Sequence, residues 1–162
     1  MKLKPPAPGM VELYPVSKSN PLPDPLIDNR VRHHEFLRQQ MEQEYKEKFV
    51  CRWSMYVFDP VFKYLILYPQ LNDKLLYFDP PFELILPVYV GHKDVPNHIE
   101  VVEDYVYLDE LCTGNTMREI WFTANRLCQR AIDECDDHHP FLEEISLSND
   151  PTTTKFKLFF GS

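Results

Sequence analysis

The sequence predicts an α+β domain preceded by an extended arm. Two stretches without internal proline, residues 29–57 and 116–136, carry hydrophobic residues at helical spacing. Residues 155–160 instead alternate in hydrophobicity, as a half-buried strand does. We therefore expect two main amphipathic helices with short strands, forming a single domain over residues 28–162. Residues 1–27 are expected to form a proline-rich N-terminal arm.

The arm is predicted from the distribution of proline. Seven of the fifteen prolines lie within the first 25 residues. Proline removes a backbone donor and holds the preceding residue in extended geometry, so we expect no helix in residues 1–27. The arm also carries apolar side chains, and we expect it to dock rather than remain disordered. Its docking surface is left open between this domain and another subunit.

The first helix is expected over residues 29–57, with Asp28 or Asn29 as its N-cap and Asp59-Pro60 beyond its end. Its apolar stripe follows steps of three and four through Leu37, Met41, Tyr45, Phe49, Trp53 and Tyr56. Such a helix is about 40 Å long, which exceeds what the core of a small domain needs. We therefore expect part of it to contact a partner, with packing on its own domain as the alternative.

Residues 59–111 are hydrophobic, and their pattern leaves helix and strand open. The motif D-P-x-F occurs twice, at Asp59 and at Asp79, which coincidence explains. Over residues 94–111, the spacing of Ile99, Val102 and Val106 favours a helix. Alternating apolar residues in the same segment also fit a strand.

The second helix has the clearest signal for its first residue. Thr116 and Glu119 have the spacing of a capping box, in which the Thr hydroxyl accepts a backbone amide and the Glu side chain reaches back. The apolar stripe that follows extends to Cys135, and Pro140 lies beyond it. We expect this helix over residues 116–136.

Composition argues against several classes of function. The net charge of −8 opposes nonspecific binding to nucleic acids. Glycine occurs four times, and no nucleotide-binding, protease or hydrolase motif is present, so no enzyme activity and no cofactor are expected. The longest apolar run, residues 64–68, is far below the ~20 residues of a transmembrane helix. Four scattered cysteines and the absence of a secretory leader predict an intracellular protein. Mitochondrial residence through an internal signal stays open.

One segment, residues 133–139, is rich in groups that can bind metals. Its acids lie at the C-terminal end of the predicted second helix, where the helix dipole prefers cations. We expect an exposed acidic helix end without a bound metal. The alternative is a metal site that uses Cys135, Asp137, His138 and His139.

The function expected from these features is that of a non-catalytic accessory or scaffolding subunit in a hetero-oligomeric complex. Aromatic residues make up 14% of the chain, and tyrosine and tryptophan are enriched at interfaces. The residues expected to contact other subunits come from the arm and the first helix: Tyr14, Leu22, Leu26, Ile27, Leu37, Met41 and Tyr45. A peripheral subunit of a mitochondrial membrane complex is one protein of this kind. The alternative is a free-standing enzyme or metal-binding protein built around residues 133–139.

Overall fold

The computed structural model describes residues 13–14, 24–58, 65–66, 70–76, 78–91, 93–147 and 155–161. In these ranges the chain forms two helices, α1 (Asp24–Tyr45) and α2 (Met117–Cys135). It also forms a five-stranded sheet made of β2 (Arg52–Phe58), β4 (Phe82–Tyr89), β5 (Tyr105–Cys112), β6 (Phe141–Leu147) and β7 (Lys155–Gly161). A small sheet pairs β1 (Leu13–Tyr14) with β3 (Leu65–Ile66). The predicted α+β class is confirmed.

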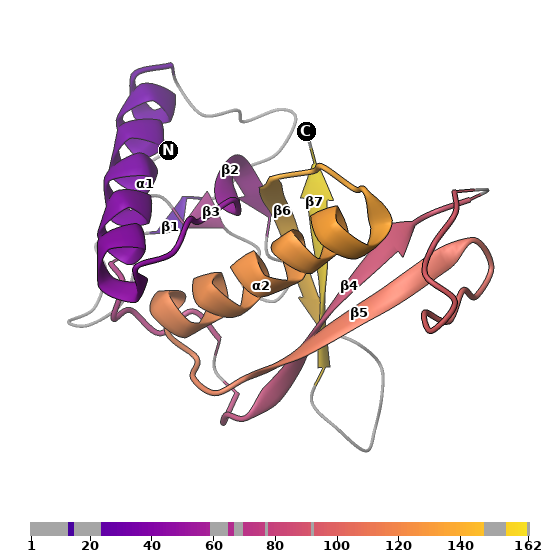
Figure 1. Ribbon diagram of the computed structural model, residues 1–162. Helices are drawn as coiled ribbons and strands as arrows, with labels where there is room; N and C mark the ends of the chain where they lie inside the picture. The colour runs from indigo at the N-terminus through magenta and orange to yellow at the C-terminus, as the bar shows by residue number, and fades with distance from the viewer. Residues whose placement is uncertain are drawn as a thin grey trace.

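The large sheet is mixed, with the strand order β2-β6-β7-β4-β5. Two antiparallel pairs, β4 with β5 and β6 with β7, are joined by the parallel pairing of β4 with β7. β2 adds to the edge of β6 in parallel. Helix α2 connects β5 to β6 and lies across one face of the sheet, while α1 stands beside β2 (Figure 1).

The core lies between α2 and the sheet. One side of α2 is fully buried, through Ile120, Trp121, Ala124 and Leu127 among others. The sheet meets it with alternate residues of its strands, because successive strand residues point to opposite faces. The buried strand residues include Leu84, Leu86, Val106, Leu108, Leu142, Phe156 and Leu158.

Helix α1 begins earlier and ends earlier than the sequence predicts. It begins at Asp24, with Pro25 in its first turn, where the N–H that proline lacks would have no partner within the helix. The prediction that residues 1–27 contain no helix is therefore wrong for residues 24–27. It ends at Tyr45, and Lys46 has a left-handed φ of 53°. The predicted helix over 46–57 is therefore wrong, and the second half of that stretch belongs to β2. The other predictions for the arm concern residues outside the described ranges. The exception is Leu13–Tyr14, whose backbone forms β1 and pairs with β3.

The sequence left helix and strand open over residues 59–111, and the described residues of this stretch show which of the two forms. Phe82–Tyr89 and Tyr105–Cys112 are strands, so the helix favoured over 94–111 is wrong. Strand β7 is confirmed, with Phe156 and Leu158 buried. Strand β6 was not predicted.

Helix α2 lies where it was predicted, but the capping box works differently. Thr116 is the N-cap, yet its hydroxyl bonds the carboxylate of Glu119 and caps no amide. The backbone amides of Met117 and Arg118 donate instead to the carbonyls of Asp73 and Leu71, both at 2.9 Å. The start of α2 is therefore held by a distant segment of the chain. Neither helix in the described part of the chain combines the length and hydrophobicity needed to cross a bilayer.

Candidate functional site

Exposed hydrophobic side chains gather on the hairpin of β4 and β5. Nine large hydrophobic side chains are exposed among the described residues, and six of them belong to this hairpin and its tip. We call these six the hairpin surface: Tyr89, Val101, Val102, Tyr105, Tyr107 and Leu111. The other three are Val31 and Phe36 on α1 and Phe159 on β7.

Of the two helices that the structure describes, α2 covers one face of the sheet, and the exposed hairpin side chains lie on the opposite face. In β5, Val106 and Leu108 point to the covered face, whereas Tyr105, Tyr107 and Leu111 point to the other. The far end of the hairpin also extends beyond α2 (Figure 1). Tyr89 lies opposite Tyr105 in the ladder, and their ring centroids are 5.4 Å apart. The tyrosines on the open face therefore lie next to one another rather than being scattered.

Negative charge lies within and around the hairpin surface. Between positions 94 and 112 the sequence contains six carboxylates and no Lys or Arg. In the described part of the chain, Glu110 alone among these six forms an ion pair, with Arg130 at 3.4 Å. Asp109 and the tip residues Glu103 and Asp104 are exposed. The surface is therefore apolar, with carboxylates both among and next to its hydrophobic side chains.

The tip holds two of these acids in an unusual backbone conformation. Val102 and Tyr105 exchange two backbone hydrogen bonds, of 2.8 and 2.9 Å, around a two-residue turn. Both central residues have positive φ, 51° at Glu103 and 67° at Asp104. Turns of this type favour Asn, Asp or Gly followed by Gly, so Glu103 at the first position and Asp104 at the second carry a conformational cost. This turn therefore holds two exposed carboxylates next to Tyr105.

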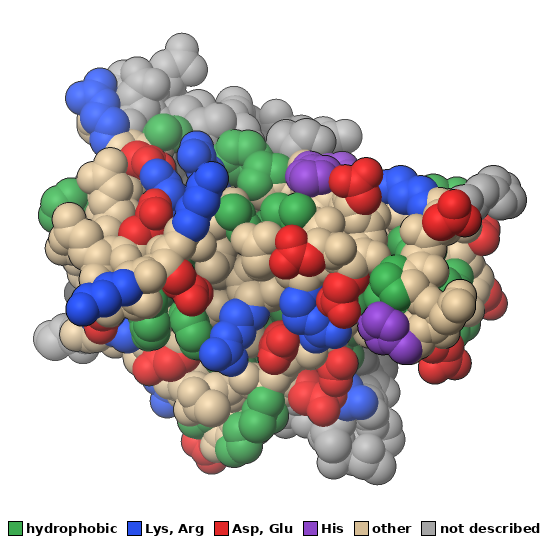
Figure 2. All heavy atoms as spheres, in the orientation of Figure 1, with side chains coloured by type: hydrophobic (Ala, Val, Ile, Leu, Met, Phe, Trp, Pro, Cys, Tyr) green, Lys and Arg blue, Asp and Glu red, His purple; other side chains and the backbone are tan. Residues whose placement is uncertain are grey.

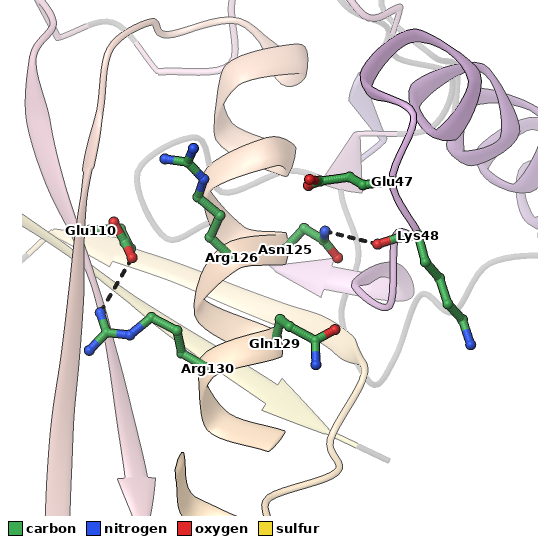
Figure 3. A pocket seen from close by; sticks show the side chains of 7 residues that line it. All are labelled: Glu47, Lys48, Glu110, Asn125, Arg126, Gln129 and Arg130. Carbon is green, nitrogen blue, oxygen red and sulfur yellow. Dashed lines mark hydrogen bonds and ion pairs between the residues drawn. The ribbon is translucent and has the colours of Figure 1, made fainter. Parts of the chain in front are cut away.

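A shallow groove of about 450 Å³ lies on the other side of the molecule, along the outer side of α2 (Figure 3). Its described lining consists of Glu47, Lys48, Glu110, Asn125, Arg126, Gln129 and Arg130. No hydroxyl, thiol or imidazole belongs to this lining. Figure 3 shows Asn125 directed toward Lys48 and Arg130 directed toward Glu110. Arg126 lies over the ring of Phe122, at 4.4 Å from its centroid.

Most polar groups in the groove are engaged within the protein. The Asn125 side chain accepts from the amides of Val50 and Cys51 and donates to the carbonyl of Lys48. On this face of the molecule, acidic and basic side chains are interspersed (Figure 2). The hydrogen bonds of Asn125 in this groove therefore join α2 to the segment between α1 and β2.

The segment 133–139 divides between core and solvent. Cys135 is buried at the end of α2, whereas His138 and His139 are exposed and bond the neighbouring carboxylates of Asp136 and Asp137. Among the described residues, no three His, Cys, Asp or Glu side chains are grouped closely enough to hold a metal. His139 therefore contacts Asp137, but in this part of the chain the alternative metal site does not gather the three ligands that a metal needs.

The predicted partner contacts on the first helix face inward. Leu37 and Met41 are buried in the core of their own domain, so their side chains are not available on the surface. Tyr45 is half-buried and stacks on Phe122, with centroids 4.5 Å apart. The structure describes only the backbone of Tyr14, Leu26 and Ile27, and Leu22 lies outside the described residues. The hairpin surface was not predicted, although the alternation in residues 105–111 and the lack of cations there were visible.

All four cysteines are free and buried, namely Cys51, Cys112, Cys128 and Cys135. Burial raises the pKa of Cys51 well above its usual value, and the nearby Cys128 adds to this. Burial, with a smaller contribution from Asp137, raises the pKa of Cys128 to about 11. The thiols therefore stay protonated and unreactive in the folded protein at neutral pH.

These shifts predict that stability falls at alkaline pH. Between about pH 9 and 11 the unfolded chain releases thiol protons that the folded chain retains, so the free energy of unfolding should decrease. Cys128 alone should account for on the order of 1–2 kcal/mol. Urea denaturation followed by tryptophan fluorescence at several pH values measures the slope. Cys128→Ala should flatten it, and an unchanged slope in that variant would contradict the assignment to Cys128.

Comparisons of the chain with protein-family models, with curated proteins and with solved structures give no match. The candidate site is accordingly assigned from exposure, geometry and charge. Those three properties coincide on the β4–β5 hairpin and not in the groove.

Proposed function

We propose that this chain is a non-catalytic accessory or scaffolding subunit of a larger multiprotein assembly, and that the hairpin surface contacts another subunit. The observation that carries the proposal is the concentration of six of nine exposed large hydrophobic side chains on one hairpin. Contiguous apolar patches on soluble proteins mark interaction sites more often than scattered residues do.

The chemistry of the surface suits a protein partner. Tyr89, Tyr105 and Tyr107 each present a rigid ring and a hydroxyl group, and tyrosine is enriched at interfaces. Lysine, which is depleted at interfaces, does not occur between positions 94 and 112. The carboxylates of this hairpin oppose contact with nucleic acid phosphates, so the partner in this proposal is a protein.

Helix α1 offers a second contact within the same proposal. Phe36 and Val31 are exposed on it, while Leu37 and Met41 hold its other side in the core. The proline-rich residues 1–23 precede α1 and would extend the contact. An intracellular complex, such as a mitochondrial membrane complex with peripheral subunits, is the type of assembly proposed.

The native particle tests this function. The full chain, tagged at its C-terminus, is produced in its native cells, extracted gently and weighed by native mass spectrometry. We expect a particle heavier than the 19.3 kDa of the chain, with other chains in fixed proportion. Tyr107→Ser should reduce the recovery of those chains at least fivefold.

The matched control is Phe159→Ser, which removes an exposed ring from a different strand. We expect it to leave the particle intact. A chain recovered only as a 19.3 kDa monomer would overturn the proposal. Equal loss of partners in both variants would show that the hairpin surface is not the contact.

A further inference from the structure

Strand β5 forms one edge of the large sheet, and its outer backbone groups can be identified. Asp104 accepts from the amide of Val90, which follows β4, at 2.9 Å, whereas Tyr105 exchanges its two bonds with Val102. Because backbone direction alternates along an antiparallel strand, the N–H and C=O groups of Tyr107, Asp109 and Leu111 point away from β4.

One side chain reaches this edge among the described residues. Arg130 donates from Nη1 to the carbonyl of Asp109 at 2.9 Å, and its Nε bonds Glu134 at 2.9 Å. In the described part of the chain, the outer backbone groups of Tyr107 and Leu111 have no hydrogen-bond partner. The centre of the edge is therefore occupied and both flanks are open.

The edge lacks most of the features that usually prevent strand pairing. Natural edges are short, bulged, or carry Pro or charged side chains, especially Lys, because an open row of amides and carbonyls is a template for another strand. β5 has eight residues, pairs with β4 without a register shift along its length, and contains neither Lys nor Pro; its charged residues are Asp109 and Glu110. Its open face carries Tyr107 and Leu111 on either side of Asp109.

We propose that β5 is a strand-addition site for an extended, basic segment of the partner protein, which pairs with residues 107–111. This inference rests on the proposed function and specifies how the partner is held. The added strand places one side chain opposite Asp109 and two others beside Tyr107 and Leu111. Its pattern is therefore apolar, any residue, Lys or Arg, any residue, apolar.

The charge around the edge selects this partner over a second copy of the chain. The six carboxylates between positions 94 and 112 attract a basic strand. Pairing of β5 with another β5 would place two such acidic segments side by side, and the chain as a whole carries −8. The incoming strand displaces Arg130 from the Asp109 carbonyl, and Arg130 keeps its ion pairs with Glu110 and Glu134.

The first test uses a synthetic peptide as the added strand: acetylated threonine-valine-threonine-lysine-threonine-valine-threonine amide. It is titrated into the full chain at low salt and followed by backbone NMR with amide exchange. We expect binding that weakens roughly tenfold when the lysine is replaced by glutamate. N-methylation of the valines and the lysine, which removes their donors, should weaken binding by a similar factor.

The amide readout separates strand addition from contact with the tyrosine face alone. Near saturation, exchange of the Tyr107 and Leu111 amides should slow at least fivefold. Binding without this protection, equal binding of the N-methylated peptide, or no binding would each overturn the inference.

The second test changes the protein. Asp109→Asn should weaken peptide binding about fivefold, whereas Asp94→Asn, which changes an exposed acid outside β5, should change it less than twofold. Both side chains are exposed, so thermal melts should show that both variants remain folded. Equal effects of the two substitutions would show that general charge, not β5, attracts the peptide. If the peptide does not bind while the native particle stays assembled, strand addition is wrong and the proposed function stands.

Discussion

Replacing Asn125 by leucine is expected to lower the free energy of unfolding by about 3 kcal/mol. The Asn125 side chain is 3% exposed and satisfies three backbone groups. Its oxygen accepts from the amides of Val50 at 2.8 Å and Cys51 at 3.0 Å, and its nitrogen donates to the carbonyl of Lys48 at 3.3 Å. Leucine fills similar space but leaves these groups unpaired. Unpaired buried groups cost about 1–3 kcal/mol each, and the partial exposure of Lys48 and Val50 lets water recover some of this.

Urea denaturation monitored by tryptophan fluorescence measures the loss. Asn115→Leu is the matched control, because Asn115 donates a single side-chain hydrogen bond, to the carbonyl of Phe78 at 3.2 Å. We expect this control to cost about 1 kcal/mol. If the two substitutions cost the same, Asn125 does not hold the segment between α1 and β2 as described.

The second large effect is expected at Trp121, where alanine should cost about 4 kcal/mol. Trp121 is the largest fully buried side chain among the described residues. It packs edge-on against Phe49 and Trp53, each with a centroid distance of 6.2 Å. Its indole N–H donates to the carbonyl of Cys51 at 2.8 Å. Alanine would remove both the packing and this hydrogen bond.

A pair of phenylalanine substitutions separates the hydrogen bond from the packing. Trp121→Phe loses the bond to Cys51 and part of the volume, so we expect a loss of about 2 kcal/mol. In Trp53 the indole nitrogen is buried without a hydrogen-bond partner among the described residues. Trp53→Phe removes that unsatisfied donor, which offsets the lost volume, and should cost less than Trp121→Phe. Thermal melts and urea denaturation of the two variants compare them, and the opposite order would contradict this account.

Parts of the fold with local signals could be predicted from the sequence. Helix α2 and strand β7 follow their own periodicities, so their positions needed no knowledge of the rest of the chain. The end of α1 could not be predicted, because Phe49 and Trp53 also continue the helical spacing. The amides of Val50 and Cys51 donate to the side chain of Asn125, about 75 residues away, instead of to a helix carbonyl. This long-range contact is one reason why the helix ends before Phe49.

Strand β6 was missed for a different reason. Its register shifts between Leu142 and Glu144, so the buried residues Leu142 and Ile145 are three positions apart. A bulge of this kind breaks the alternation by which strands are identified. Two consecutive glutamates further weaken the apolar pattern.

An apolar stripe on a helix does not distinguish a core contact from a partner contact. Leu37 and Met41 were expected at an interface but lie in the core, since an apolar stripe looks the same in either place. In β5, both faces of the strand carry hydrophobic side chains, Tyr107 on one and Leu108 on the other. Which face stays exposed depends on where α2 lies, and that follows from long-range packing.

The order of strands in the sheet has a consequence for synthesis of the chain. β7 follows the other four strands of this sheet along the chain, yet it is the central strand, between β6 and β4. While a ribosome is still adding residues before 155, the β4–β5 hairpin and the β2–β6 pair have no strand to join them. Both edges that β7 later fills are then open to other nascent chains. Emergence of residues 155–161 from the ribosome is therefore the step that allows the two halves of the sheet to join, and closing such distant contacts slows folding.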